Sequence, residues 1–152
     1  LFGVFDVAAT PGSNNMFYSK SNSGSDAGWF IRHETSGKVR FAHTSHGTND
    51  GGLQQSVITS AASRSSSSIY VICTFESGVG AELYIDGSSE GTSSTTTAVL
   101  QSHVQDVYIG GQYGASRKPT DSDIATCGAY DKLLSESEIS DLNGWMSDTF
   151  GL

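Results

Sequence analysis

Basic side chains are scarce in this sequence. Lysine and arginine together number 8, against 16 aspartates and glutamates, which gives a formal net charge of -8. A nucleic-acid surface needs a stripe of basic residues, so this composition argues against nucleic acid as a partner. The acidic surface is most simply explained as a source of solubility, because molecules of like charge repel one another.

Long apolar runs, cysteines and prolines are also few. No window approaches the roughly 18–20 apolar residues of a membrane-spanning helix, so no membrane span is expected. The two cysteines, Cys73 and Cys127, cannot form a disulfide scaffold, and their spacing excludes a Cys-x-x-Cys metal or redox motif. They are either two small buried thiols or one bridge between neighbouring strands.

The length of 152 residues suits a single domain spanning 1–152 around one hydrophobic core. No signal peptide is visible, and Leu1 is not a translation start. The chain is therefore expected to be a processed product, an engineered fragment or a segment cut from something longer.

Glycine, serine and threonine are abundant instead, which favours many short strands joined by turns. The clearest strands lie at 69–76 and 81–86, where Val, Ile, Tyr, Phe and Thr dominate. The second strand ends at Asp86-Gly87, a dipeptide that readily enters a left-handed turn. Further strands are expected at 1–7, 16–20, 56–59, 104–109 and 124–130, with a solvated serine-rich connector at 60–67.

A second hairpin is predicted at 28–43, with Gly37 at the left-handed position of its loop. Alternation places six residues on its inward face: Trp29, Ile31, His33, Val39, Phe41 and His43. The opposite face is expected to meet solvent and carries Phe30, Arg32, Glu34, Lys38, Arg40 and Ala42. The two histidines are read as ordinary polar contacts and not as metal ligands.

Only the C-terminal part of the chain has a helical pattern. Ser135 and Glu138 have the spacing of a capping box, and Leu134 and Ile139 that of a hydrophobic staple. An apolar stripe that docks on the strands is expected from four residues: Ile139, Leu142, Trp145 and Met146.

These motifs occur in a recognisable order along the chain. The order is Leu83-Tyr84-Ile85-Asp86-Gly87, Ile109-Gly110, Ala129-Tyr130-Asp131 and Leu134-Ser135-x-x-Glu138-Ile139-x-x-Leu142, preceded by Tyr18-Ser19-Lys20 and Gly28-Trp29-Phe30-Ile31. In this order they resemble laminin-G-like domains of the concanavalin A-like lectin/glucanase superfamily, over nearly the whole chain. The resemblance implies an all-β fold, a two-sheet antiparallel jelly-roll sandwich with one short C-terminal helix. It also implies a binding or adhesion module found outside the cytoplasm.

The chain departs from the family in two ways. The family usually has a strand ahead of the one at 2–7, so the front of the domain is expected to be trimmed or remodelled. A counterpart of the family's calcium ligands is missing. Asp121 and Asp123 alternate within one loop and Asp50 lies in another, which keeps calcium as an alternative to the expected absence of any cofactor or metal.

Catalysis is not expected. Glycosidases of the superfamily need two carboxylates across a sugar cleft, usually on a strand in a Glu-x-Asp-x-x-Glu pattern. The nearest match, Glu136-x-Glu138-x-x-Asp141, falls in the predicted helix, where the acids face an N-terminus that favours negative charge. No Gly-x-Ser-x-Gly elbow supports a serine nucleophile.

Two long polar loops are the predicted ligand site. Tyr113 supplies a ring to stack on a sugar face, with Arg117 beside it in one loop; the other loop carries His46, Asn49 and Asp50. Long loops in compact domains are often functional. Trp29 and Trp145 are assigned to the core or the helix dock.

The sequence therefore predicts a non-catalytic extracellular recognition module, most plausibly for glycans. The alternative is a structural decoration or adhesion protein of a virion or cell-surface assembly, acting through protein–protein contacts. The expected partner is a glycan or a surface protein, and the expected location is extracellular, on a cell surface or on a virion. The fold alone does not choose between these functions.

Overall fold

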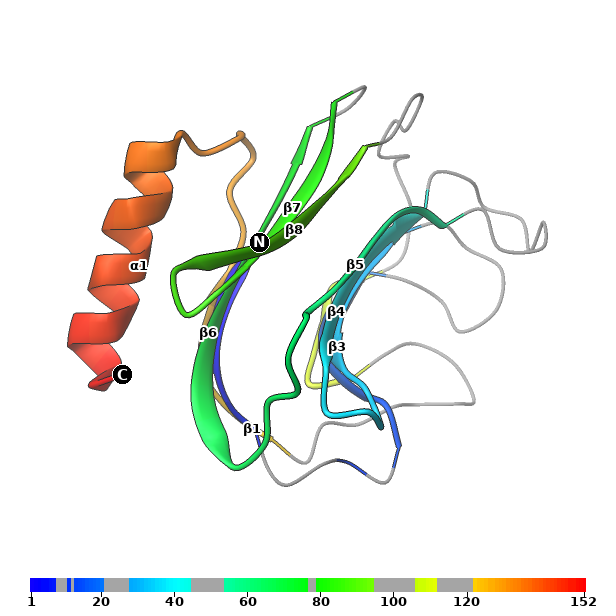
Figure 1. Ribbon diagram of the computed structural model, residues 1–152, viewed down its shortest axis with the longest axis vertical. Helices are drawn as coiled ribbons and strands as arrows, with labels where there is room; N and C mark the ends of the chain where they lie inside the picture. Colours follow the sequence, from blue (N-terminus) through cyan, green and yellow to red (C-terminus); the bar gives the residue numbers. More distant parts are fainter. Residues whose placement is uncertain are drawn as a thin grey trace.

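The structure, a computed structural model, describes residues 1–7, 11, 13–20, 28–44, 54–76, 79–94, 106–111 and 122–152. Two antiparallel five-stranded sheets face each other and one helix covers the outside of the first sheet (Figure 1). Sheet A has the order β10 (Asp123–Gly128), β1 (Phe2–Val7), β6 (Ser67–Glu76), β7 (Gly80–Ile85) and β8 (Ser88–Ser94). Sheet B has the order β5 (Gln54–Thr59), β4 (Val39–Thr44), β3 (Trp29–His33), β2 (Asn15–Lys20) and β9 (Tyr108–Ile109). The predicted all-β sandwich with one C-terminal helix is confirmed.

The turns follow the predicted backbone chemistry. Asp86 and Gly87 have φ angles of 51° and 77°, both in the left-handed region that a two-residue hairpin turn requires. They connect β7 to β8, with Ile85 opposite Ser88. Gly37, at φ 77°, closes the β3–β4 hairpin through the hydrogen bond from its N–H to the carbonyl of Glu34, at 2.8 Å. The register of both hairpins is therefore fixed by their turns.

The main core lies between the two sheets. At its centre the ring of Phe5 on β1 stacks on that of Phe17 on β2, with centroids 4.3 Å apart and an interplanar angle of 10°. Five of the six residues predicted to point inward from the β3–β4 hairpin are buried, namely Ile31, His33, Val39, Phe41 and His43, and Trp29 is partly buried against the same core. Ala42, predicted on the solvent face, is buried as well. Both faces of β1 are apolar, as predicted. The strand lies inside sheet A, so one face packs against the main core and the other against the helix.

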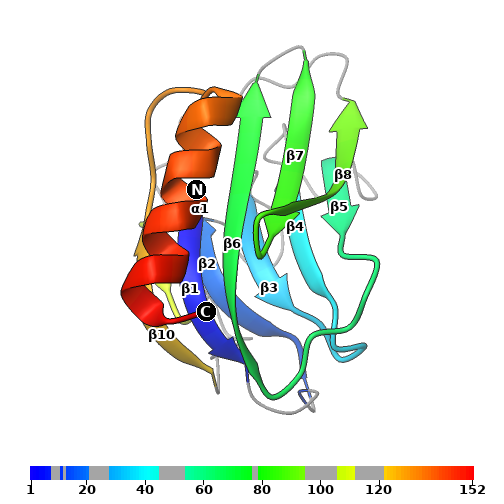
Figure 2. The same ribbon diagram turned by 60° about the vertical axis from the view of Figure 1, so that its left-hand side comes forward.

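The helix α1 (Glu136–Phe150) begins as the sequence predicted. The hydroxyl of Ser135 accepts the N–H of Glu138 at 3.4 Å, and the Glu138 carboxylate accepts the N–H of Ser135 at 2.9 Å. Ile139, Leu142 and Met146 are buried against Val4 and Ile72 of sheet A. Figure 2 shows the helix lying across β1 and β6, so these side chains form a second, smaller core on the outer face of sheet A.

Trp145 is a correction to the prediction. The helical pattern predicts Trp145 in the docking stripe or the core, but the residue is 46% exposed, and its indole meets the ring of Phe150 edge-on. The reason is angular: Trp145 lies about 100° around the helix from Met146. Met146 is at the centre of the buried stripe, so Trp145 lies beside the stripe, on the side of the helix that faces solvent.

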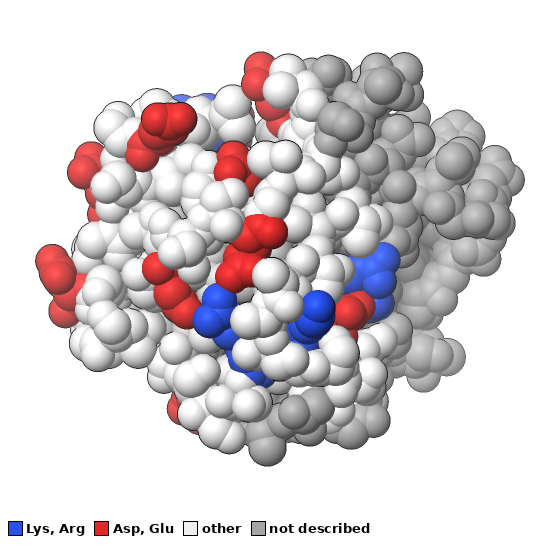
Figure 3. All heavy atoms as spheres, in the orientation of Figure 1, with Lys and Arg blue, Asp and Glu red and all other residues white. Residues whose placement is uncertain are grey.

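The connector between β5 and β6 is solvated for most of its length, as expected, but one residue ties it to both sheets. The Arg64 N–H donates to the carbonyl of Gly37 at 2.6 Å, and the Arg64 carbonyl lies 2.8 Å from the Nε2 atom of buried His33. Its guanidinium pairs with Glu90 at 2.7 Å and with Asp86 at 3.8 Å. Figure 3 shows that the basic side chains on this face gather beside acidic ones, so they do not form a free basic patch.

Strand boundaries near the C-terminus also differ from the prediction. Of the expected strand 104–109, residues 104–105 lie outside the described part of the chain, and the rest contains β9 at Tyr108–Ile109 only. The strand β10 ends at Gly128 and not at residue 130. Both cysteines are free thiols. Cys73 on β6 and Cys127 on β10 are separated by β1. Strands two apart lie about 9–10 Å from each other, beyond the reach of a disulfide.

No helix in the described part of the chain is both long enough and apolar enough to cross a membrane.

Candidate functional site

An exposed tyrosine marks the segment that leads from sheet A to the helix. After β10 ends at Gly128, the segment 129–134 runs to α1 and carries Tyr130, whose side chain is 50% exposed. One face of the Tyr130 ring stacks on Phe2 of β1, with centroids 5.6 Å apart and an interplanar angle of 29°. Phe2 in turn packs against the second, smaller core between sheet A and the helix. The tyrosine is therefore held in place from below while much of its ring remains open to solvent.

Trp145 supplies a second exposed aromatic side chain on α1. Its indole makes a T-shaped contact with Phe150 one turn later, with centroids 6.0 Å apart and an interplanar angle of 86°. The buried neighbour Met146 anchors this stretch of helix to sheet A. A rigid element thus presents the tryptophan, which limits the conformational entropy that it loses on binding a ligand.

Tyr130 and Trp145 line the same groove, which we call the aromatic groove. Its volume is about 400 Å³, and it is lined by Phe2, Tyr130, Lys132, Leu134, Glu138, Asp141, Leu142 and Trp145. The apolar side chains come from β1, from the segment 129–134 and from α1, whereas the polar ones come only from the last two. The groove therefore combines aromatic rings with hydrogen-bonding groups.

The polar side of the aromatic groove is dominated by carboxylates. Lys132 Nζ donates to Glu138 Oε1 at 2.5 Å, while Glu138 Oε2 accepts the Ser135 N–H. The lysine and then the serine hydrogen bonds lower the pKa of Glu138 to about 2, and the Glu138 carboxylate raises the pKa of Lys132. Asp141, also exposed, adds a second negative group. Near neutral pH the groove carries two carboxylates and one ammonium group.

This arrangement suits a ligand with one apolar face and a rim of hydroxyl groups. The ring C–H bonds of a sugar form such a face, and a tyrosine or tryptophan ring offers a flat apolar partner for it. Carboxylate and ammonium groups at the rim bond hydroxyls and fix the orientation of the ligand. The groove therefore offers the kinds of contact that a sugar ring can use.

The predicted ligand site consists of five residues in two loops. Tyr113, Arg117, His46, Asn49 and Asp50 all lie outside the described residues, so the predicted ligand site stays a prediction.

The same holds for two of the three aspartates considered for calcium, Asp50 and Asp121. Asp123 begins β10, exposed and opposite Asp6 of β1. In the part of the chain that the structure describes, no group of three or more His, Cys, Asp or Glu is placed to hold a metal ion.

The two histidines of the hairpin have different environments. His33 reaches the Arg64 carbonyl at 2.8 Å, as expected of an ordinary polar contact. His43, opposite Trp29, is equally buried, yet neither of its ring nitrogens has a hydrogen-bond partner among the described residues. Burial lowers the pKa of His43 from 6.5 to about 4. The prediction of an ordinary polar contact is therefore wrong for His43.

Sequence reasoning missed the aromatic groove because it assigned Tyr130 to a strand and Trp145 to the dock. One signal was available for Trp145: its angular offset from Ile139, Leu142 and Met146 on a helical wheel. For Tyr130 the signal was weaker, consisting of an aromatic residue directly before Asp131 and Lys132. The contact of Tyr130 with Phe2 joins the two ends of the chain and has no local signature.

Comparison with known proteins agrees with this fold. The model of a family described as the concanavalin A-like lectin/glucanases superfamily matches residues 5–140. The chain is similar in structure to the CBM40 of Ruminococcus gnavus IT-sialidase bound to α2,3-sialyllactose, with a TM-score of 0.69, 16% identity, and coverage of 94% of this chain and 80% of that one. A second structure of the same CBM40 gives a TM-score of 0.69 and 15% identity, with coverage of 93% of this chain and 80% of that one.

A more distant likeness is to the receptor-binding domain of botulinum neurotoxin mosaic serotype C/D, with a TM-score of 0.59 and 12% identity over 95% of this chain and 35% of that one. Among curated protein sequences, none matches this chain significantly. At these identities the structural similarities establish the fold.

Proposed function

This chain belongs to the concanavalin A-like lectin/glucanase superfamily, and from that premise we propose that it is a glycan-binding module that acts through the aromatic groove. The observation that carries the proposal is the pair of exposed rings, Tyr130 and Trp145, in one groove with hydrogen-bonding side chains. The similar CBM40, solved with sialyllactose, supports it, because the same fold there holds an oligosaccharide.

The electrostatics of the groove support a binding role over a catalytic one. A glycosidase acid must keep its proton near neutral pH, so its pKa is raised. The pKa of Glu138 is lowered instead, to about 2, by Lys132 and Ser135. Its carboxylate is also committed to the helix cap. We infer a non-catalytic module that works outside the cell, on a cell surface or on a virion, where polysaccharides and glycoproteins are met.

The direct test compares Tyr130→Ala and Trp145→Ala with the unmodified chain on a glycan array and by titration calorimetry with the best array ligand. Each substitution is expected to weaken binding about tenfold or more, as truncation of a central aromatic contact commonly does. Leu133→Ala is the matched control, because Leu133 is exposed in the same segment but does not line the groove. Unchanged affinity in both aromatic variants would show that the sugar binds elsewhere. An array without hits would refute glycan binding and favour the role in a surface assembly.

The charge of the groove predicts which glycans bind. Neutral oligosaccharides are expected to bind severalfold more tightly than sialylated ones, because a sialic acid carboxylate would meet Glu138 and Asp141 with only Lys132 as a counter-charge. Asp141→Asn should reduce this preference, and so should high salt, which screens exposed charges. Calorimetry with lactose and sialyllactose at two ionic strengths measures this preference for neutral glycans. Tighter binding of sialyllactose would contradict the assignment of the groove.

A further inference from the structure

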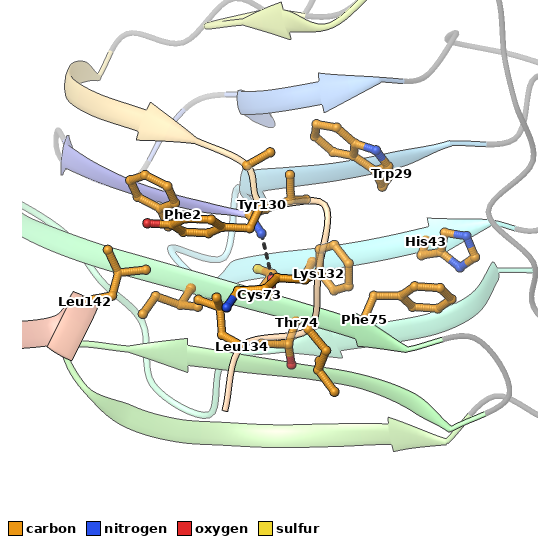
Figure 4. Close-up of a pocket in the computed structure, with 15 residues that line it drawn as sticks. Phe2, Trp29, His43, Cys73, Thr74, Phe75, Tyr130, Lys132, Leu134 and Leu142 are labelled. Carbon is orange, nitrogen blue, oxygen red and sulfur yellow. Dashed lines mark hydrogen bonds between the residues drawn. The ribbon is translucent and has the colours of Figure 1, made fainter. Parts of the chain in front are cut away.

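A second cavity, the inner pocket, adjoins the aromatic groove but reaches further into the molecule. Its volume is about 200 Å³, and its walls come from both sheets, from the segment 129–134 and from Leu142 of α1. Figure 4 shows Phe2, Tyr130 and Leu142 at one end, and Trp29, His43 and Phe75 gathered at the other. The second end is remote from the sugar-binding rings, so the function proposed above does not use it.

The polar feature of that end is His43. Its side chain is 1% exposed, and both ring nitrogens lack a hydrogen-bond partner among the described residues. Its ring contacts Phe75, with centroids 4.3 Å apart. A buried polar group without a partner costs roughly 1–3 kcal/mol, so native structures rarely keep one without a reason. The imidazole can therefore receive a hydrogen-bond partner that the described residues do not provide.

The walls restrict what that partner is. Trp29, Phe41 and Phe75 surround the histidine with aromatic surface, which favours a ring that packs face to face or edge to face. A charged ligand would be poorly compensated, since Lys132, the one charged side chain among the described lining residues, is already paired with Glu138. A single water is a poor occupant because it needs 2–4 polar partners. An apolar cavity of about 150 Å³ is large enough for benzene, so a single-ring molecule fits.

We propose that the inner pocket binds a small uncharged phenol whose hydroxyl forms a hydrogen bond with the His43 imidazole. The hydroxyl donates a hydrogen bond to the unprotonated ring nitrogen, and the aromatic ring lies against Trp29 and Phe75. The burial that keeps His43 neutral leaves this nitrogen free to accept. The inference stands independently of glycan binding, because it uses a different cavity end and different residues.

The test measures binding of phenol and of toluene to the chain 1–152 near neutral pH. Toluene has a similar size and no hydroxyl. Phenol is expected to bind at least about tenfold more tightly, the equivalent of one buried hydrogen bond. It should also shift the ¹⁵N resonances of the His43 ring and change the Trp29 fluorescence. Equal binding of the two probes, no binding of either, or His43 resonances that phenol leaves unchanged would each overturn the proposal.

Two substitutions separate the hydrogen bond from the shape of the pocket. His43→Phe should abolish the preference for phenol over toluene, whereas His43→Gln, which keeps an acceptor, should retain part of it. Leu133→Ala, a change at another residue of the pocket lining, is the control and should leave the preference intact. A preference for phenol that survives in His43→Phe would overturn the assignment to His43. A bound water on His43 that phenol does not displace would do so as well.

Discussion

Met146→Ala is expected to lower the free energy of unfolding by about 2–5 kcal/mol, whereas Trp145→Ala, one residue away, should cost less than about 1 kcal/mol. Met146 is fully buried and packs with Val4, Ile72, Ile139 and Leu142 between α1 and sheet A. Truncation would remove apolar contacts and leave a cavity beneath a helix that is too short to be stable without packing. Trp145 has solvent beside it, so its removal leaves no enclosed void.

Urea denaturation followed by circular dichroism measures both values. Limited proteolysis adds a local readout, because a loosened α1 in Met146→Ala should be cleaved faster than in Trp145→Ala. The pair also controls for changes in intrinsic helix propensity, since alanine is introduced at adjacent interior positions of the same helix. If Trp145→Ala proves as damaging as Met146→Ala, the tryptophan belongs to the dock and the aromatic groove loses one of its walls.

The fold was predictable where its determinants are local. The β-branched and aromatic residues of β6 and β7 identify both strands, and Asp86-Gly87 specifies its turn through backbone sterics alone. The capping box of Ser135 and Glu138 acts over three residues, so the helix start was also visible. Each of these signals lies within a few residues of the structure that it predicts.

The aromatic groove was not predictable, because its parts come from distant positions. Phe2, Tyr130 and Trp145 lie on a strand, a connecting segment and a helix that meet only after sheet A has formed. Arg64 is a similar case, since its partners are on two hairpins and its sequence neighbours are solvated serines. Residue type and spacing do not encode such contacts, whereas they do encode caps and turns.

Acidification is expected to lower the free energy of unfolding because of the buried histidine. His43 has a pKa of about 4 in the folded protein and 6.5 as its ordinary value, because burial disfavours the imidazolium. At pH values between these two pKa values, the unfolded chain binds a proton and the folded protein does not, so the free energy of unfolding falls as the pH drops. The full difference corresponds to about 3 kcal/mol. This loss of stability should be nearly complete at about pH 4.

The variant His43→Phe isolates this effect, because it keeps an aromatic ring and removes the titrating group. Its free energy of unfolding, measured by urea denaturation at several pH values, should be nearly flat from pH 6.5 to 4, where the unmodified protein declines. Glu138 does not interfere, because its stabilising charge is lost only between its ordinary pKa of 4.5 and about 2. Parallel curves for the two proteins would mean that His43 accepts a proton as readily when folded as when unfolded. In that case water reaches the imidazole, and the inner pocket is wet at the end where the phenol was placed.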